Sequence, residues 1–102
     1  MPTKIELIVD NQDDNDAFDA KWPSLLLLAR ALPGLQRLES GKVWPKEDGT
    51  PTPAHRSLLL YFAGYDEASA AVAGPEGAAF FQAFFPAANG KVIPLFTDIE
   101  ES

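Results

Sequence analysis

The sequence contains no cysteine, a single histidine and few cationic residues. Without cysteine, the protein can form no disulfide, no thiolate nucleophile and no cysteine-ligated zinc or iron–sulfur centre. Eight Lys and Arg stand against fifteen Asp and Glu, which gives a formal net charge of −7 with His55 neutral. Because nucleic-acid affinity rests largely on cations that neutralise phosphates, this balance argues against nucleic acid and against anionic membrane surfaces as partners.

Long apolar runs are also missing. Runs such as Leu25–Ala29 are far shorter than the roughly 20 residues of a membrane span. The first ten residues alternate apolar side chains with Lys4 and Glu6, which is typical of a strand and not of a signal peptide, so we expect a cytoplasmic protein. The 102 residues, 46% of them hydrophobic, are the size of one domain, and we predict a single domain over residues 1–102.

Apolar patterning predicts four strands. The run in Arg56–Phe62 is almost continuously apolar, which predicts a central and least exposed strand. Pro94 cannot donate a ladder hydrogen bond, so the last strand is expected at a sheet edge. The four predicted strands cover residues 3–10, 35–44, 56–62 and 91–99.

Helical periodicity fills the intervening segments. The acidic stretch Asn11–Asp19 suits a helix cap and first turn, with the helix running to about Leu32. Asp66 is predicted to cap a short helix that stops at Gly74, and Pro75 to open the last helix. Two helices have an apolar face. The face of the first helix is expected to pack into the core, and that of the last helix to pack either in the core or against a second copy; the residues are Phe18, Trp22, Leu25, Ala29 and Leu32 on the first helix, and Phe80, Phe81, Phe84 and Phe85 on the last.

The resulting order, β-α-β-β-α-β, is that of a ferredoxin-like α+β sandwich. Right-handed crossovers put the helices on one face of the sheet. The other face keeps Ile8, Leu59 and Tyr61 together with either Val92 and Phe96 or Ile93 and Leu95. Two such faces packed together close into a barrel, so we predict a homodimer through the sheet face.

The segment 14–38, DNDAFDAKWPSLLLLARALPGLQRL, combines an acidic turn, a Phe with an aromatic residue four positions later, an apolar helix and a Leu-Pro-Gly-Leu turn into a strand. Together with Leu60-Tyr61-Phe62 and Gly74-Pro75-Glu76-Gly77, it resembles the EthD-like family of the dimeric α+β barrel superfamily. The resemblance implies a small dimeric barrel with a pocket between sheet and helices. The wider superfamily includes cofactor-free monooxygenases, isomerases, cyclases and decarboxylases.

One departure from the family bears on function. EthD-like sequences commonly carry a histidine on the first helix, about eight residues before the Pro-Gly turn, where this chain has Leu25. A leucine cannot transfer a proton, so the usual acid or base is absent.

The remaining acid–base candidates are Tyr61, Glu39 and His55. Their phenol, carboxylate and imidazole groups are of the kinds that transfer protons in active sites. The alternative readings are surface ion pairing for Glu39 and a solvated loop position for His55. Ligand contacts are expected from aromatic and apolar residues and one carboxylate: Phe18, Trp22, Leu25, Glu6 and Trp44. For Phe18, Trp22 and Leu25 the competing interpretation is core packing, and for Trp44 it is a lid or a dimer contact.

No phosphate loop, dinucleotide glycine pattern or paired-histidine zinc motif is present, and the acidic cluster lacks the glycine and distal glutamate of an EF-hand. We therefore expect neither a cofactor nor a metal. Two functions stay open: a cofactor-independent oxygenase, isomerase or cyclase that acts on a small hydrophobic or aromatic carbonyl compound, and a non-catalytic protein that binds a small hydrophobic molecule or serves a degradation pathway.

Overall fold

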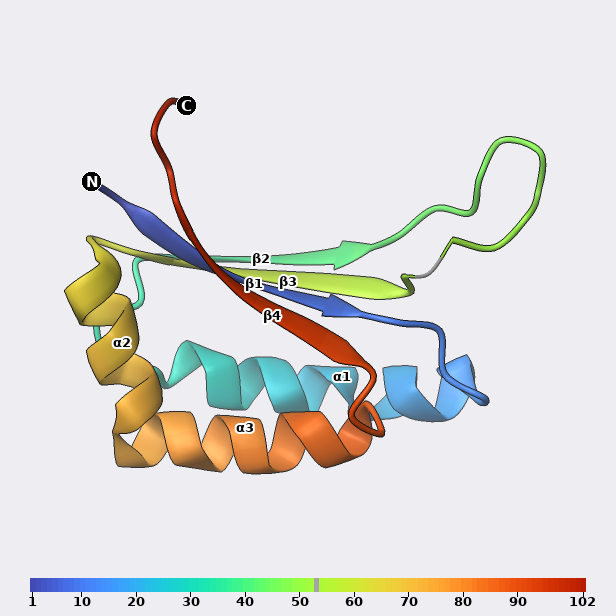
Figure 1. Ribbon diagram of the computed structural model, residues 1–102. Helices are drawn as coiled ribbons and strands as arrows, with labels where there is room; N and C mark the ends of the chain where they lie inside the picture. Colours follow the sequence, from blue (N-terminus) through green and yellow to red (C-terminus); the bar gives the residue numbers. More distant parts are fainter. Residues whose placement is uncertain (53) are drawn as a thin grey trace.

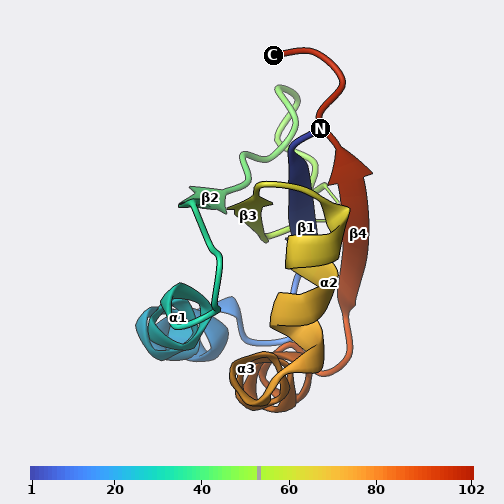
Figure 2. The same cartoon turned by 90° about the vertical axis from the view of Figure 1, so that its left-hand side faces the viewer.

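A computed structural model describes residues 1–52 and 54–102. Its four strands form one antiparallel sheet in the order β2-β3-β1-β4, and its three helices lie together on one face of that sheet (Figures 1 and 2). The predicted ferredoxin-like α+β fold is thereby confirmed. Along the chain the elements are β1 (Thr3–Val9), α1 (Asn15–Arg30), β2 (Arg37–Lys42), β3 (Arg56–Phe62), α2 (Tyr65–Ala73), α3 (Pro75–Ala87) and β4 (Val92–Asp98).

The core lies between the sheet and the helices. Strict alternation in β1 sends one set of side chains to the helices, and the paired positions of β3 do the same, because residues opposite one another in an antiparallel ladder share a face. All five predicted positions of the first helix are buried, and they pack against two of the four phenylalanines of α3, Phe80 and Phe84. The strand residues that complete this core are Ile5, Leu7, Val9, Leu58, Leu60 and Phe62.

Helix α1 begins at Asn15 because Asp14 caps it: the Asp14 carboxylate accepts a hydrogen bond of 3.0 Å from the backbone N–H of Ala17. Pro23 lies inside the continuous helix and does not begin a separate segment. Asp19, which we expected to help the cap, instead points toward the sheet and binds His55, just before β3, and Arg56, the first residue of β3.

Three further expectations are corrected. Helix α2 starts at Tyr65 after an extended Gly64, so Asp66 lies in the first turn and is not the cap. Strand β2 is shorter than 35–44, since two residues separate the turn that ends at Gly34 from the strand, and the β2–β3 loop begins after Lys42. Strand β1, and not β3, is the least exposed strand, because β3 opens with the polar residues 56 and 57.

Strand β4 lies at the edge of the sheet beside β1, as Pro94 predicts. Its register resolves the choice that the sequence left open. Ile93 pairs with Ile8 and Leu95 with Glu6, so these two β4 residues lie on the face away from the helices, whereas Phe96 pairs with Ile5 on the helix side.

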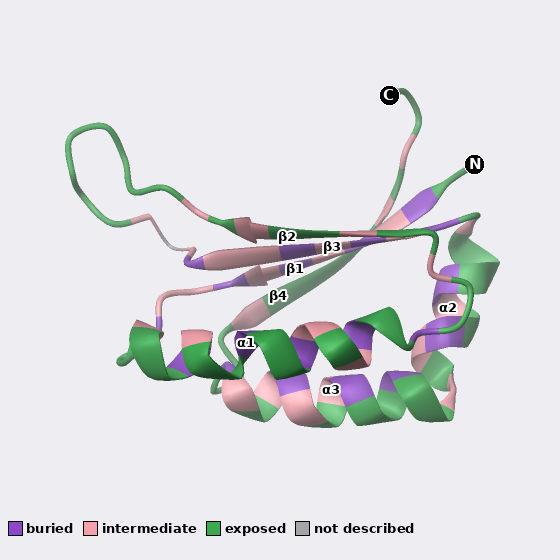
Figure 3. Cartoon of the chain, turned by 180° about the vertical axis from the view of Figure 1, so that it is seen from behind, coloured by how far each residue is buried: buried purple, intermediate pink, exposed green. Residues whose placement is uncertain are grey.

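We call the helix-free side of the sheet the open face. It carries the apolar residues Ile8, Leu59, Ile93 and Leu95 along its centre and one edge. Ile93 and Leu95 keep 58% and 45% of their surface exposed, and Figure 3 shows this exposed strand beside the buried core. Both the β2–β3 loop and the C-terminal segment extend on the open-face side (Figures 1 and 2).

Candidate functional site

A phenol, a carboxylate and a guanidinium meet on the open face where β2 pairs with β3. The register puts Arg37 opposite Tyr61, and Glu39 lies two residues further along the same face. The Tyr61 hydroxyl donates a hydrogen bond of 2.6 Å to Glu39 Oε1, and Arg37 Nη2 lies 2.5 Å from Glu39 Oε2. The Arg37 guanidinium also lies 4.6 Å from the centre of the Tyr61 ring. The sequence-predicted pair Tyr61 and Glu39 is therefore brought into direct contact.

The contact between Tyr61 and Glu39 shifts the pKa of both side chains. The hydrogen bond to Glu39, with burial, raises the pKa of Tyr61 above its ordinary value of 10.0. The same bond is the largest cause that lowers the pKa of Glu39; desolvation opposes it, and the charge of Arg37 and its hydrogen bond lower the pKa further. At neutral pH the pair thus holds a protonated phenol against an ionised carboxylate, which is the arrangement of a proton donor with an adjacent acceptor.

Glu6 lies on the same face in the neighbouring strand β1. One carboxylate oxygen is 3.2 Å from Lys4 Nζ, and the other accepts a hydrogen bond of 3.1 Å from the Thr97 hydroxyl of β4. Both oxygens of the Glu6 carboxylate are thereby paired with side chains of the sheet.

An open cleft of about 360 Å³ lies beside the Tyr61 ring. The strands contribute Lys4, Arg37 and Tyr61 to its wall. The C-terminal segment closes the other side with Ile99, Glu101 and Ser102. A small molecule that entered this cleft would contact Tyr61 and Arg37, the two partners of Glu39.

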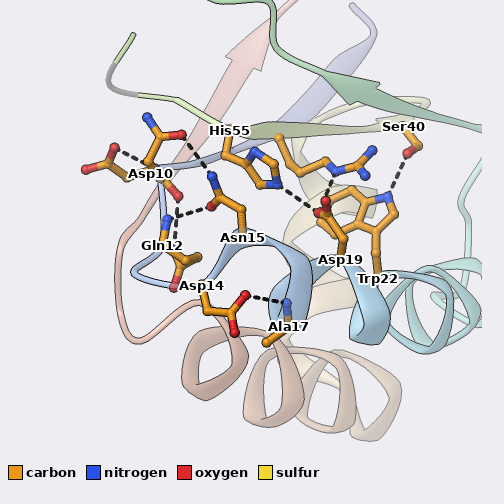
Figure 4. A network of polar contacts seen from close by, with 11 residues as sticks. Asp10, Gln12, Asp14, Asn15, Ala17, Asp19, Trp22, Ser40 and His55 are labelled. Atoms are coloured by element: carbon orange, nitrogen blue, oxygen red, sulfur yellow. Dashed lines mark hydrogen bonds and ion pairs between the residues drawn. The ribbon is translucent and has the colours of Figure 1, made fainter. Parts of the chain in front are cut away.

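His55 lies in a different cluster, on the helix side of the sheet (Figure 4). Its Nε2 is 2.8 Å from Asp19 Oδ1 on α1, and Arg56 Nε donates to the same oxygen at 3.1 Å. Only 8% of His55 is exposed, so the interpretation of a solvated loop residue is wrong. The third acid–base candidate is therefore separated by the sheet from Tyr61 and Glu39.

Asp19 is the residue that sequence reasoning missed. Burial alone would raise its pKa, but the hydrogen bonds from Arg56 and His55 outweigh burial, and the pKa of Asp19 lies below its ordinary value of 3.8. Asp19 and His55 are 36 positions apart in the chain, and the segment between them carries no periodicity that would have linked them. The available signal was the position of Asp19 next to Phe18, at the border of the buried stripe of α1.

The same cluster continues to β2. The Trp22 indole N–H donates a hydrogen bond of 2.8 Å to the Ser40 hydroxyl, and the Arg56 guanidinium lies 5.5 Å from the Trp22 ring (Figure 4). Because these contacts join α1 to both strands and leave the polar groups paired, they stabilise the helix against the sheet.

The predicted ligand-contacting residues divide by location. Phe18, Trp22 and Leu25 lie in the core between α1 and the sheet. Trp44 is 86% exposed at the start of the β2–β3 loop. Glu6 alone shares the open face with Tyr61 and Glu39.

Residues 1–52 and 54–102 contain no group of three or more His, Cys, Asp and Glu side chains arranged to hold a metal ion. No helix among these same residues has the length and apolarity needed to cross a membrane.

No family model matches the sequence. An 11.0 kDa protein of Rhodococcus erythropolis, described as uncharacterized and encoded in the thcB–thcC intergenic region, is 36% identical over 100 residues, which cover 95% of this chain and 94% of that protein. A crystal structure of an ethyl tert-butyl ether degradation (EthD) family protein from Bacillus halodurans C-125 superposes with a TM-score of 0.89 at 18% identity, over 96% of this chain and 98% of that one. The chain belongs to one family with the Rhodococcus protein, and its fold is EthD-like. The resemblance drawn from the sequence is confirmed.

Two further solved structures share this EthD-like fold. A dimeric ferredoxin-like protein of unknown function from Jannaschia sp. CCS1 has a TM-score of 0.71 at 14% identity, over 96% of this chain and 99% of that one. A hydroxynitrile lyase from Passiflora edulis has a TM-score of 0.80 at 14% identity, over 99% of this chain and 95% of that one. At these identities the likeness is one of fold.

Proposed function

We propose that this EthD-like protein is a homodimer that encloses the two open faces, and that each protomer uses Tyr61 and Glu39 to transfer a proton to or from a small, largely apolar carbonyl compound. The observation that carries the proposal is the 2.6 Å hydrogen bond between the Tyr61 hydroxyl and the Glu39 carboxylate on a face that no helix covers.

The charges of the open face suit contact with a second copy. The strands place two cations there, Lys4 and Arg37, and two anions, Glu6 and Glu39, each paired within the face. The strand residues of this surface therefore carry no net charge although the whole chain carries −7. Internally paired strands with an apolar centre can meet their own copy with little like-charge repulsion between the two sheets, and a two-fold axis makes such a contact self-complementary.

Enclosure would also change the chemistry of the pair. Once water is excluded, the interaction of the Tyr61 hydroxyl with an oxygen atom that gains negative charge becomes stronger, because the effective dielectric falls. Glu39, kept ionised by Tyr61 and Arg37, then accepts a proton from the carbon beside the substrate carbonyl while the Tyr61 hydroxyl turns to hydrogen-bond the carbonyl oxygen, and the protonated Glu39 returns that proton to the substrate at the end of the reaction. Ile8, Leu59, Ile93 and Leu95 supply the apolar surface against which the rest of the substrate packs.

The solved structures lend support at the level of fold. The Jannaschia protein is dimeric, and the Passiflora protein is an enzyme, so this fold is compatible with both parts of the proposal.

A second candidate is a binding protein without catalysis. It is favoured by Leu25, which is only 3% exposed and lies in the core at the position where EthD-like sequences commonly carry a histidine. On this alternative the Tyr61–Glu39 pair orients a ligand carbonyl and no bond is made or broken.

The test starts with native mass spectrometry of the purified protein and continues with a panel of aliphatic and aromatic aldehydes and ketones, assayed for binding and for turnover. Tyr61→Phe and Glu39→Gln should each lower turnover by about 100-fold or more while the dimer persists. Tyr65→Phe is the matched control, since Tyr65 is an exposed tyrosine on α2. Binding without turnover would leave the second candidate, and equal turnover in all variants would exclude the pair from the mechanism.

A further inference from the structure

His55 is a buried ionisable side chain that the reaction proposed for the open face does not use. Its backbone N–H donates a hydrogen bond of 2.6 Å to the carbonyl oxygen of Val9, and its own carbonyl oxygen accepts one of 3.0 Å from the N–H of Val43. The imidazole packs edge-on against Phe18, with 6.2 Å between ring centres, and its Nε2 lies 2.8 Å from Asp19 Oδ1 (Figure 4). Since both the backbone and one ring nitrogen are held, the orientation of the imidazole is fixed.

The contact with Asp19 determines which ring nitrogen carries the proton. Burial alone would raise the pKa of Asp19, but the hydrogen bonds from Arg56 and His55 bring it below its ordinary value, so the carboxylate is ionised at neutral pH. An ionised carboxylate only accepts hydrogen bonds, so the neutral imidazole must carry its proton on Nε2 and a lone pair on Nδ1. Within residues 1–52 and 54–102, no hydrogen bond reaches Nδ1 and no buried side-chain nitrogen is without a partner, so Nδ1 is open to the space beside it. His55 therefore presents a fixed hydrogen-bond acceptor there.

A cavity of about 260 Å³ lies beside His55, between the N-terminal end of α1 and the β2–β3 loop. Asn11 and Asn15 form one part of its wall, His55 and Lys42 form another, and residues 43, 45, 51, 52 and 54 complete it. Pockets that bind drug-sized molecules span roughly 300–1,000 Å³. The cavity therefore suits a smaller ligand.

The two asparagines of the wall are already paired. The Asn11 amide donates a hydrogen bond to the carbonyl oxygen of Thr52, and the Asn11 side-chain oxygen accepts one of 3.4 Å from the Asn15 amide. The Asn15 side-chain oxygen accepts one of 2.8 Å from the backbone N–H of Gln12. These bonds hold the wall in place and leave recognition of a ligand to the other polar groups.

Lys42 supplies a positive charge at this cavity. It lies on the helix side of β2, two positions after Ser40, whose hydroxyl accepts a hydrogen bond from Trp22 of α1. Lys42 forms no ion pair in the part of the chain that the structure describes, and none of the described residues that line the cavity is acidic. A ligand that pairs with both free groups needs an anionic group for Lys42 and a hydrogen-bond donor for His55 Nδ1. That donor is a neutral hydroxyl, because a second cation would be repelled by Lys42.

We propose that this cavity binds a small hydroxy carboxylate, whose hydroxyl donates a hydrogen bond to His55 Nδ1 and whose carboxylate pairs with Lys42. Asp19 is a positioning residue in this site, because it acts on the ligand only through the orientation and tautomer of His55. The sheet separates the site from the Tyr61–Glu39 pair. The proposed site requires neither the homodimer nor the activity proposed for the open face.

The test uses the fact that the chain has a single histidine. In long-range proton–nitrogen correlation spectra of the isotope-labelled protein at mildly alkaline pH, Nδ1 should have the chemical shift of an unprotonated ring nitrogen and Nε2 that of a protonated one. Glycolate, lactate and 3-hydroxybutyrate are then each titrated beside the analogue that lacks the hydroxyl: acetate, propionate or butyrate. At least one hydroxy acid should shift the Nδ1 signal saturably, with a Kd about fivefold or more below that of its analogue.

Two variants test the assigned roles. Lys42→Met should raise this Kd severalfold and leave the spectrum of the free imidazole unchanged, and Lys21→Met, at an exposed position of α1, is the matched control. Asp19→Asn should populate the other tautomer, because an amide can also donate to Nε2, whereas a loss of stability alone would leave the tautomer of the folded protein unchanged. A protonated Nδ1 in the free protein, hydroxy acids that bind no more tightly than their analogues, or a Kd unaffected by Lys42→Met would each overturn the proposed site.

Discussion

Replacement of Leu25 by histidine restores the side chain that EthD-like sequences commonly carry on this helix, and it tests whether space for chemistry exists between α1 and the sheet. Leu25 is 3% exposed and belongs to the core cluster. We expect Leu25→His to destabilise the protein and to confer no activity, because the imidazole would enter a packed apolar region. The control is Leu27→His on the same helix, where the leucine is 68% exposed.

The size of the loss follows from two contributions. Truncation of a buried leucine to alanine costs about 2–5 kcal/mol through lost burial and the cavity left behind. Histidine refills part of that volume but buries ring nitrogens without partners, at about 1–3 kcal/mol. We therefore expect Leu25→His to lower the free energy of unfolding by roughly 3–5 kcal/mol and Leu27→His to change it by less than about 0.5 kcal/mol.

Urea denaturation followed by circular dichroism, at one fixed protein concentration, measures this loss. With a slope of about 1.5 kcal/mol per molar urea, the midpoint of Leu25→His should fall by about 2–3 M. If the new histidine is buried in the neutral form, the free energy of unfolding of the Leu25→His variant should fall further as the pH drops below about 6.5, because the unfolded chain then binds a proton that the folded chain cannot bind. Leu25→Ala should lack this additional pH dependence.

The result that would refute this reasoning is a Leu25→His protein within about 1 kcal/mol of the wild type. Such tolerance would mean that position 25 borders an accessible cavity. The pocket between sheet and helices that the family resemblance implies would then gain support over the site on the open face.

Three further predictions concern single contacts. Leu59→Asp should convert the dimer to a monomer in native mass spectrometry, because Leu59 lies on the open face, whereas Leu27→Asp on the exposed side of α1 should leave the dimer intact. A dimeric Leu59→Asp protein would contradict the proposed interface. Asp19→Asn should lower the free energy of unfolding by about 1–2 kcal/mol at neutral pH. Since folding lowers the pKa of Asp19, this difference from the wild type is complete above a pH of about 4 and disappears as the pH falls through the lower pKa of the folded state. A difference that did not shrink in acid would exclude this linkage. A change from glycine to alanine inside a helix usually stabilises by roughly 1 kcal/mol, but Gly77→Ala should lower the midpoint of thermal unfolding, because a Cβ there would collide with the backbone carbonyls of Ala71 and Val72. Ala79→Gly, on the exposed side of α3, should show only the ordinary penalty of a glycine in a helix.

The fold could be predicted from the sequence because its signals are local. Period-two alternation in β1, the stripe from Phe18 to Leu32 and the punctuation by Gly74 and Pro75 each depend on residues close together in the chain. Element order and right-handed crossovers then leave few ways to arrange the sheet. Cap positions proved less predictable. The N-cap of α2 is Gly64 and not Asp66, and the Asp19 side chain binds His55 instead of the helix N-terminus.

The candidate site was predictable only in part. Tyr61 and Glu39 were identified as candidates from residue type and strand position, but their contact depends on the register between β2 and β3. A shift of that register by one residue would put the two side chains on opposite faces of the sheet. His55 was placed in solvent because no local pattern indicates its partner Asp19 on α1. Which of the two β4 sets faces outward was likewise undecided until the pairing of β4 with β1 was known.

Short-range signals are enough to predict the elements, the buried stripe of α1, the edge position of β4 and the absence of cysteine chemistry, because propensity, periodicity and composition act over short distances. The folded chain was needed to show that Tyr61, Glu39 and Arg37 share one face, that Asp19 holds His55 and Arg56 on the other side, and that the charged strand residues of the open face pair with one another. Each of these features joins residues from different elements. Their geometry arises from strand register and helix docking, to which distant parts of the chain contribute together.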